Sequence, residues 1–478
     1  MKLLLINPFN PVVSMSKVRG WNFLNKYRVW KPLGLLVLAR LTPPDWEVEV
    51  IDENLGPLDA RTLPRPDLVG ITAFTSQAPR AYELAGLFRA VGVPVVMGGI
   101  HATMCLAEAL GHADAVVTGE AEVVWPQVLA DVRSGTLQRV YTGGPVPMAE
   151  IPPARHDLLA GRYHFGSIQS TRGCPLNCSF CSVTAFNGHL FRRRPLENVI
   201  AELRQIREKR ILFVDDNLIG TRKDHMACAK DLFRAMIREG LTRPWVCQAT
   251  INFADDEELL DLASRSGCAG VFIGFESPTV EGLIAVGKRF NIREGRDYPA
   301  SVCRIQRHGI TVMGSFIMGI DTDRPGIGAT VARAAEDYGI DMANVVILTP
   351  LPGTALFKDM ERQGRIMAND YPADWQYYSL SHPVSRFLHF TWSELVQELV
   401  QFHDLFYSYP KIVGRVLRLV LRGRTPRKAL LSLVANLTCR HNYLQDGKVH
   451  ALRCATPEAA TWMTGLHSTA QTSGGTPG

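Results

Sequence analysis

Three cysteines lie within one run of eight residues, Cys174-Pro-Leu-Asn-Cys178-Ser-Phe-Cys181. Thiolates at this CxxxCxxC spacing can bind an iron–sulfur cluster from a single loop. Three cysteine ligands for a four-iron cluster leave one iron without a protein ligand, and a small molecule can bind there. The motif therefore predicts an iron–sulfur site with one open iron.

Structural zinc and disulfide bonding are the two other uses of such cysteines. A structural zinc site needs a fourth Cys or His, and the nearest candidate, His189, has no second ligand close to it in sequence. The other seven cysteines occur singly, and the first residues do not have the pattern of a secretory signal. Zinc remains the minor alternative, and disulfide bonding is disfavoured.

The cysteine motif, with Phe180 directly before its last cysteine, resembles the signature of radical S-adenosylmethionine (SAM) enzymes. The resemblance implies that Cys174, Cys178 and Cys181 hold a 4Fe–4S cluster whose fourth iron binds SAM. It also implies reductive cleavage of SAM to a 5′-deoxyadenosyl radical, which abstracts a hydrogen atom. In such an enzyme the protein positions the substrate and excludes water.

The length and charge of the chain limit the other possibilities. With 478 residues the chain exceeds one ordinary hydrophobic core, so two or three domains are expected. The formal net charge of +6 is modest and gives no reason to expect a nucleic-acid partner. No apolar run is long enough to span a bilayer. We therefore expect a cytoplasmic protein with reduced cysteines.

Short apolar runs alternate with helical patterns in residues 1–145, which we expect to form the first domain. The runs at residues 3–6, 48–51, 68–72, 93–97 and 115–118 have the length and composition of buried strands. The alternation predicts an open, doubly wound parallel sheet of Rossmann or flavodoxin type, in which ligands bind at the carboxyl ends of the strands. The residues expected there are Asn7, Asp52, Asn54, Thr72, Thr75, Ser76, Gly98, Gly99, His101, Gly119 and Glu120.

This first unit has neither a GxGxxG nor a GxxxxGK[ST] motif. Through residues 32–36, 50–54, 70–75, 98–103 and 119–122 it resembles the cobalamin-binding domain of one branch of the radical SAM superfamily. The resemblance implies that the strand-end residues hold cobalamin, with small side chains allowing the macrocycle to approach. Alternatively, Gly98 and Gly99 only form a tight turn.

A histidine ligand below the cobalt is not expected. No Asp-x-His-x-x-Gly segment occurs in the chain, so the resemblance implies cobalamin without a histidine lower ligand. His101 lies at a different strand end, and a lone histidine is more often a hydrogen-bonded structural residue.

Residues 146–163 are rich in proline and are expected to form a linker. Residues 164–357 then contain six strand-like segments separated by helical patterns, which predict a partial (β/α)6 barrel. The radical SAM resemblance implies the same fold. Residues 358–454 are expected to form a mainly helical region that covers the barrel, and residues 455–478 a disordered tail.

Barrel enzymes carry their chemistry at the carboxyl ends of the strands. Asp215-Asp216-Asn217 follows the second strand, where many radical SAM proteins carry a Gly-Gly-Glu segment that holds the SAM amino group. The pair of carboxylates can instead bind a cation or cap the next helix. Arg289 is a candidate for the SAM carboxylate or a solvated surface residue. The residues that the resemblance assigns to SAM are Phe180, Asp215, Asp216, Asn217, Gln248, Glu276 and Pro350.

Two segments of the C-terminal region leave alternatives open. Trp375, Tyr377 and Tyr378 can line a substrate pocket or form the core of the extra helices. Residues 411–431 interleave basic and apolar side chains. That pattern is typical of a peripheral helix on the inner face of an anionic membrane, and also of a basic exposed helix on a soluble domain.

The favoured function is that of a cobalamin-dependent radical SAM C-methyltransferase, which acts on an unactivated carbon of a small-molecule or lipid-like intermediate. The resemblance also implies an external electron donor such as ferredoxin or flavodoxin. Cobalamin-dependent cyclisation or rearrangement is the first alternative, and a non-catalytic iron–sulfur binding or sensing protein is the second. Cobalt and cluster must face one substrate cavity, so the carboxyl-end surfaces of the two α/β units are expected to face each other.

Overall fold

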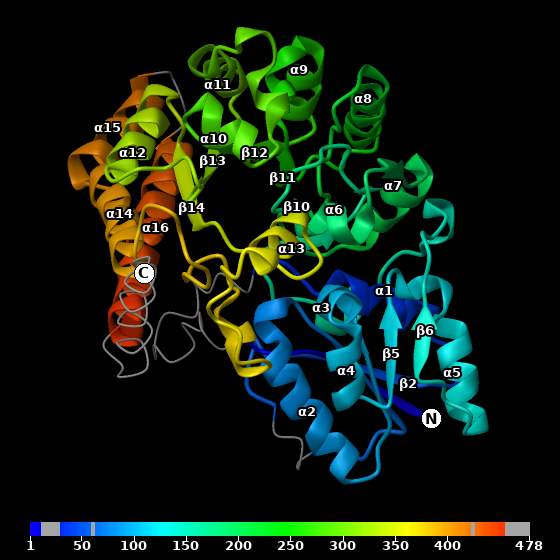
Figure 1. Ribbon diagram of the computed structural model, residues 1–478. Helices are drawn as coiled ribbons and strands as arrows, with labels where there is room; N and C mark the ends of the chain where they lie inside the picture. The colour runs from blue at the N-terminus through cyan, green and yellow to red at the C-terminus, as the bar shows by residue number, and fades with distance from the viewer. Residues whose placement is uncertain (11–28, 59–62, 422–425, 455–478) are drawn as a thin grey trace, which may run out of the picture.

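Two six-stranded parallel sheets form the framework of the molecule, and helices cover them (Figure 1). The computed structural model describes residues 1–10, 29–58, 63–421 and 426–454. The first sheet has the order β2-β1-β3-β4-β5-β6, and the second has the order β14-β13-β12-β11-β10-β7. All strand pairs within both sheets are parallel. The expected α/β fold class is confirmed.

The first sheet is doubly wound. Alternate residues of β1 enter two separate cores: Leu3 and Leu5 pack with helices α1 and α5, and Leu4 and Ile6 pack with α2, α3 and α4. The order 2-1-3-4-5 is that of flavodoxin-like sheets, in which the direction of winding changes between β1 and β3. The strands are β1 (Lys2–Asn7), β2 (Glu47–Asp52), β3 (Leu68–Thr72), β4 (Val95–Gly98), β5 (Ala115–Thr118) and β6 (Val140–Thr142), and the helices are α1 (Leu33–Leu41), α2 (Ala78–Ala90), α3 (Gly99–Met104), α4 (Leu106–His112) and α5 (Trp125–Ser134).

The edge strand β6 was not expected. It has three residues, Val-Tyr-Thr, and only Tyr141 is buried, so the segment lacks the apolar run that marks the interior strands. Its pairing with β5 forms an edge of the sheet, where one neighbour is enough.

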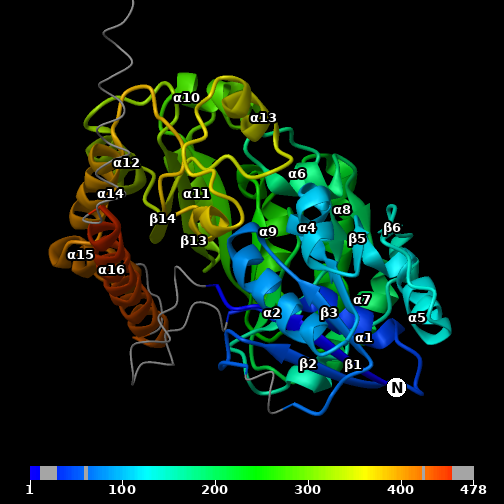
Figure 2. The ribbon, with the colours of Figure 1, turned by 60° about the horizontal axis from the view of Figure 1, so that its bottom comes forward.

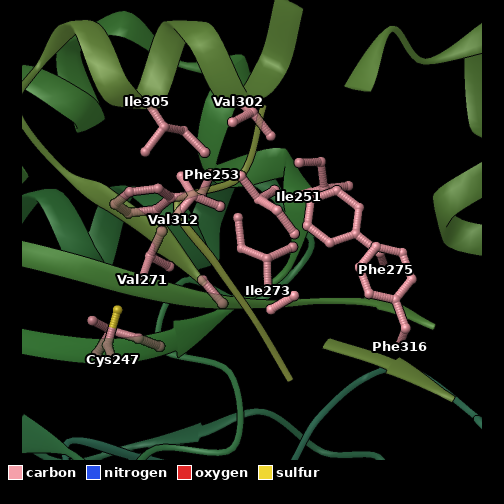
Figure 3. Close-up of a cluster of buried hydrophobic side chains, with 14 of the residues drawn as sticks. Cys247, Ile251, Phe253, Val271, Ile273, Phe275, Val302, Ile305, Val312 and Phe316 are labelled. Carbon is pink, nitrogen blue, oxygen red and sulfur yellow. The ribbon is translucent and has the colours of Figure 1, made fainter. Parts of the chain in front are cut away.

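The strands of the second sheet follow one another in chain order, as in a partial (β/α) barrel. Val302 and Ile305 of α11 pack over Val271 of β12 and Val312 of β13, which are register partners (Figure 3). The strands are β7 (Gly166–Ile168), β10 (Ile211–Phe213), β11 (Trp245–Ala249), β12 (Cys268–Glu276), β13 (Thr311–Met318) and β14 (Met342–Ile347), and the covering helices are α7 (Leu196–Gln205), α8 (Lys223–Arg238), α9 (Glu257–Arg265), α11 (Tyr298–Arg307) and α12 (Ile327–Asp337).

The proline-rich segment 146–163 connects the two sheets and is packed along its length. Met148, Ile151 and Leu159 are buried in the core of the first sheet. His156 Nε2 lies 2.9 Å from Glu202 Oε1 of α7 in the second unit. The segment expected to be a linker does connect the two units, and its buried apolar residues make it a packed strap between the sheets.

Three helices end the described chain: α14 (Trp392–Phe406), α15 (Tyr409–Leu421) and α16 (Pro426–Cys454). Helix α15 begins at Tyr409 and has Pro410 in its first turn. The three helices pack on α12 and on one another, at the opposite end of the molecule from the first sheet (Figure 1 and Figure 2). No helix in the described ranges has both the length and the apolar character to cross a bilayer. The predicted tail, residues 455–478, lies outside the described residues.

Not all basic residues of segment 411–431 face outwards, as a basic membrane-facing surface would require. Arg415 is 3% exposed, and its guanidinium lies 2.5 Å from Glu336 Oε1 of α12 and donates to Asn436 Oδ1 of α16. Arg415 is thus a buried structural residue that joins α15 to α12 and α16.

Candidate functional site

One cavity of about 450 Å³ lies between the carboxyl ends of the first sheet and the cysteine-bearing side of the second. The two carboxyl-end surfaces therefore face each other, as expected. From the first sheet, the cavity is lined by six of the predicted residues, Asn7, Thr72, Gly98, Gly99, Gly119 and Glu120; the second unit contributes Gln169, Arg172, Ser182, Val183, Phe186, Asn187, Val214 and Asp216.

Two glycines of the cavity wall have backbone conformations that favour glycine. Gly99 has φ +87°, and a Cβ there would lie 2.5 Å from Thr72 Oγ1. Gly119 has φ +70°, and a Cβ there would lie 2.4 Å from the carbonyl oxygen of Gly143. Tight turns thus require these glycines, and the turns also leave the wall free of side chains where a flat cofactor could approach.

Asp52 and Asn54 lie at the same edge of the sheet but do not line the cavity. Asp52 Oδ1 accepts from the Asn54 side chain at 2.7 Å and from Asn7 Nδ2 at 3.0 Å. Asp52 Oδ2 accepts from the Tyr163 hydroxyl at 2.6 Å. These carboxylate oxygens fasten the end of the strap to the first sheet, a use that the strand-end pattern could not reveal.

Thr75, Ser76 and His101 are also outside the cavity lining. Ser76 Oγ accepts from Asn10 Nδ2 at 3.1 Å. His101 is fully buried, 2.9 Å from the Tyr82 hydroxyl and 3.4 Å from Glu108 Oε1. His101 therefore does not line the cavity, and its contacts are those of a hydrogen-bonded structural histidine.

The cysteine loop runs from β8 (Thr171–Arg172) to α6 (Ser182–Asn187), and its three thiols are free. Burial raises the pKa of Cys178 to about 12 and also raises that of Cys174, while the Lys288 ammonium acts in the opposite direction on both. In the described part of the chain, no three Cys, His, Asp or Glu side chains converge on a single-ion position. Each cysteine of a four-iron cluster binds a different iron, so a cluster does not need that convergence.

Asp215 holds the strand that leads into the cysteine loop. It is fully buried, and its carboxylate accepts hydrogen bonds from the backbone and hydroxyl groups of Ser170 and Thr171. Burial raises its pKa to about 6, against the effect of these donors. The capping alternative is wrong because Arg222 occupies the N-cap position of α8. The side chain of Asp215 therefore positions the loop.

Asp216 holds the loop at its two ends. Its Oδ2 accepts from the Gly173 N–H at 2.8 Å, one residue before Cys174, and from Asn187 Nδ2 at 3.0 Å, at the end of α6. Asp216 also lines the cavity. The two adjacent carboxylates thus fix the path of the chain around the predicted cluster site.

Glu276 and Lys288 form a buried ion pair beside the cysteine loop, with 2.9 Å between Glu276 Oε1 and Lys288 Nζ. Glu276 ends β12 with φ +65°, a left-handed conformation that is uncommon for a residue other than glycine. Burial opposes the charge on Lys288, but Glu276 and the thiols of Cys178 and Cys174 raise its pKa. The neighbouring Arg289, the basic residue expected here, is exposed. Apart from its position after α10 (Val280–Ala285), nothing in the sequence marks Lys288 as a residue of the site.

Of the other predicted SAM residues, Asn217, Gln248 and Pro350 lie on β11 or after β10 and β14, and Phe180 lies in the cysteine loop. Asn217 is buried, and its Oδ1 has no hydrogen-bond partner, so it can accept a hydrogen bond from a bound ligand. Gln248 is exposed, while its strand neighbours Cys247 and Ala249 are buried toward the helices, so Gln248 faces the inner side of the barrel. Phe180 packs partly buried against the second core, and Pro350 is buried.

A network of four charged side chains joins the two units beside the cavity. Arg172 Nη1 lies 2.9 Å from Glu120 Oε2, and Arg172 Nη2 donates to Glu122 Oε1 at 2.8 Å. Glu120 also accepts from Arg192 and from the Val146 N–H. Although burial opposes its ionisation, Arg192 and Arg172 lower the pKa of Glu120. The network ties the end of β5 to the residue two positions before Cys174.

Trp375 and Tyr378 belong to a hydrophobic core and do not line the cavity. Trp375 is 3% exposed, donates to the Glu108 carboxylate at 3.0 Å and meets His101 edge to face, with 5.3 Å between ring centroids. Tyr377 packs partly buried against the same core. The substrate assignment of these aromatics is therefore not supported by their positions, and the core alternative describes them.

Comparison with known proteins identifies a domain in each of the two α/β units. Residues 24–129 match the B12 binding domain model, and residues 168–325 match the radical SAM superfamily model. Bacteriochlorophyllide d C-12(1)-methyltransferase of Chlorobaculum tepidum is 31% identical, over 73% of this chain and 77% of its own length. Hopanoid C-2 methylase of Rhodopseudomonas palustris is 28% identical, over 83% and 76%.

A solved structure has the same fold. The radical SAM methyltransferase TsrM of Kitasatospora setae superposes with a TM-score of 0.65 over 84% of this chain and 90% of its own, at 19% identity. The two matched domains use a 4Fe–4S cluster, SAM and cobalamin, and the described residues fit these groups: three free thiols in one anchored loop, an unpartnered Asn217 oxygen and a glycine-walled cavity. The chain is an enzyme and belongs to the cobalamin-dependent radical SAM methyltransferase family.

Proposed function

We propose that the protein transfers a methyl group to an unactivated carbon of a small-molecule or lipid-like biosynthetic intermediate. The observation that carries the proposal is the shared cavity, which the end of the first sheet and the cysteine loop line together. When bound, the cluster and SAM supply a 5′-deoxyadenosyl radical, and cobalamin supplies the methyl group. The chain's own residues then have to hold these groups on either side of a substrate and keep water out.

The residues proposed to perform this task fall into three sets. Cys174, Cys178 and Cys181 are the proposed cluster ligands. Asn7, Thr72, Gly98, Gly99, Gly119 and Glu120, which line the cavity, are proposed to contact cobalamin. SAM is proposed to contact the side chains of Asn217, Gln248 and Glu276 and the backbone around Asp216, and to pack on Phe180 and Pro350.

The apolar side chains that line the cavity support an apolar, lipid-like substrate. Leu33, Ile100 and Phe186 line it, and the partly exposed Trp30 and Phe74 stand among its lining residues. Apolar lining of this kind binds an apolar molecule by removing its surface from water, while the charged residues that also line the cavity can orient polar groups. The similarity to a hopanoid methylase supports the same substrate class.

Anaerobic reconstitution with iron, sulfide, hydroxocobalamin, SAM and a reductant tests the reaction. The wild type should form 5′-deoxyadenosine, and Cys174→Ala/Cys178→Ala/Cys181→Ala should form none. With SAM labelled in its methyl group, an extract of the host's small molecules and lipids should yield a labelled product. A product that has lost hydrogen but carries no label would favour cyclisation or rearrangement. Absence of SAM cleavage by the reconstituted wild type would favour a non-catalytic iron–sulfur protein.

Two partners complete the proposal. An external one-electron donor such as ferredoxin or flavodoxin is required to start SAM cleavage, and replacing the chemical reductant by reduced flavodoxin should sustain it. We also propose peripheral contact with the inner face of the membrane through residues 411–431, where a lipid-like substrate would be found. Fractionation of cells that produce the enzyme at native level should recover part of it with the membranes.

A further inference from the structure

Helices α15 and α16 carry large apolar side chains on surfaces that the described part of the chain leaves open. On α15 the exposed residues are spaced by three, four or one positions, which places them on one stripe of the helix. The exposed residues of α16 have the same spacing. They are Tyr409, Val413, Leu417, Val420 and Leu421 on α15, with exposed fractions of 50–85%, and Leu430, Leu431, Val434 and Leu437 on α16, with 38–60%.

The basic side chains of α15 lie on the opposite side of the helix from its apolar stripe. Lys411, Arg415 and Arg418 gather around one carboxylate, Glu336 of α12, at 3.8, 2.5 and 3.7 Å. An ordinary surface helix buries its apolar stripe and exposes its charges. In α15 the buried positions are Ile412 and Arg415, while the apolar stripe stays exposed, so the stripe does not pack on the described part of the protein.

The sequence around the apolar stripe is rich in basic residues. Between Asp404 and Asp446 the sequence contains eight Lys or Arg residues and no Asp or Glu. Leu421, 85% exposed, ends α15, and Arg422, Arg424, Arg427 and Lys428 follow within seven residues in sequence. Apolar side chains flanked by basic residues without acidic ones are typical of helices that lie in the interface of an anionic bilayer.

We propose that the apolar face of α15 and α16 docks into the headgroup and acyl-chain boundary of an anionic membrane, with the helices parallel to the surface. The inference rests on the proposed membrane contact and identifies the side chains that make it. A second copy of the chain is the less favoured occupant, because a symmetric contact would bring two basic regions together. The docking residues are apolar; the basic residues attract the surface, and Arg415 belongs to the protein interior.

Vesicle flotation of the full-length reconstituted enzyme tests the proposal. The wild type should float with phosphatidylcholine vesicles that contain phosphatidylglycerol and much less with phosphatidylcholine alone. Val413→Ser/Leu417→Ser/Leu421→Ser should reduce the bound fraction at least about ten-fold, because each lost apolar side chain weakens interfacial insertion. The matched control, Leu87→Ser/Val91→Ser, changes two exposed apolar residues at the end of α2 and should float like the wild type.

Three outcomes would overturn the proposal: no flotation of the wild type, equal flotation of the triple variant, or a concentration-dependent dimer that the triple variant abolishes while vesicles are not bound. The last outcome would identify a second copy as the occupant. 5′-Deoxyadenosine formation, measured on the same preparations, separates this question from the reaction. If SAM cleavage fails while flotation follows the expected pattern, only the proposed function is wrong.

Discussion

At the scale of single residues, two adjacent carboxylates fix the path of the cysteine loop. Asp215 and Asp216 lie at the strand end where the family resemblance placed them, yet both carboxylates bind the cysteine loop itself. Lys288 was missed and Arg289 chosen, because a run of two adjacent basic residues does not show which one turns inward. Burial next to Glu276 decides it, and burial depends on the packing of the end of α10 against the cysteine loop, which no local pattern encodes.

Lys288→Gln should destabilise the protein, because it leaves the Glu276 carboxylate buried without its cation. Removing one partner of a buried ion pair costs about 3–5 kcal/mol, and both side chains here are 9% exposed. Lys288→Gln/Glu276→Gln should lose less than the sum of the two single changes. Urea unfolding of the cofactor-free proteins measures the cycle, and additive losses would contradict a coupled pair.

Asp323→Asn should change the pH dependence of stability. Burial raises the pKa of Asp323 to about 6, against its two backbone donors, the N–H groups of Gly319 and Ile320. A carboxyl with a raised pKa in the folded state contributes stability below its unfolded pKa of 3.8 and loses that contribution as the pH rises through about 6. The asparagine cannot ionise and keeps an acceptor for the two donors.

The melting temperatures of wild type and Asp323→Asn should therefore diverge between pH 4 and pH 7, with the variant more stable at the higher pH; the raised pKa corresponds to about 3 kcal/mol at most. Arg333→Gln, which changes an exposed residue of α12 and leaves the surroundings of the carboxyl in place, is the control. A constant difference across this range would show that Asp323 titrates normally.

At the scale of elements, the sequence predicted the strands with long apolar runs and their order along the chain. Periodicity located the interior strands of both sheets within a few residues. It missed β6, which lacks an apolar run. It also could not show that the strap is buried, because prolines mark a loop without showing what covers it.

The cysteine loop is the element on which the cluster site depends, and Asp215→Ala should loosen it. The change leaves the donors of Ser170 and Thr171 without their buried acceptor, so the segment before the loop loses its fixed path. After identical reconstitution, the variant should contain less iron and sulfide per chain than the wild type. Asp224→Ala removes an exposed carboxylate paired with Arg222 and serves as the control. Equal cluster content in Asp215→Ala would contradict the positioning role.

At the scale of the whole molecule, ionic and hydrophobic contacts fix the two sheets relative to each other. The network of Glu120, Glu122, Arg172 and Arg192 closes one side of the cavity, and the strap follows it along the first core. The sequence indicated two α/β units facing one cavity, but it could not reveal this network, because each of its ion pairs joins residues 50 or more positions apart.

Glu120→Ala/Glu122→Ala should allow the two units to vary in separation. Pulsed dipolar EPR between cob(II)alamin and the reduced cluster measures that separation directly, and the distance distribution should broaden relative to the wild type. The pair Glu257→Ala/Glu258→Ala, two exposed carboxylates at the start of α9, is the control. An unchanged distribution would show that the strap alone sets the spacing.

The first sheet also depends on residues from the far end of the chain. Trp375, Tyr378 and Val384 complete the core that covers α2 and α4. A fragment of residues 1–163 should therefore bind the apolar dye ANS and melt at a lower temperature than the same sheet does in the full chain. Adding a purified fragment of residues 164–478 should reduce the dye binding. A compact, dye-free 1–163 fragment would contradict this dependence.

The same contact sets an order of events during synthesis. The strands of the first sheet leave the ribosome early, but the side chains that close one of its two faces are translated only after the whole barrel. Until then Tyr82 and His101 lack the tryptophan that packs over them. The nascent chain must keep an open apolar face through most of its synthesis, so premature termination anywhere before residue 375 would release an aggregation-prone product and not a free cobalamin-binding module.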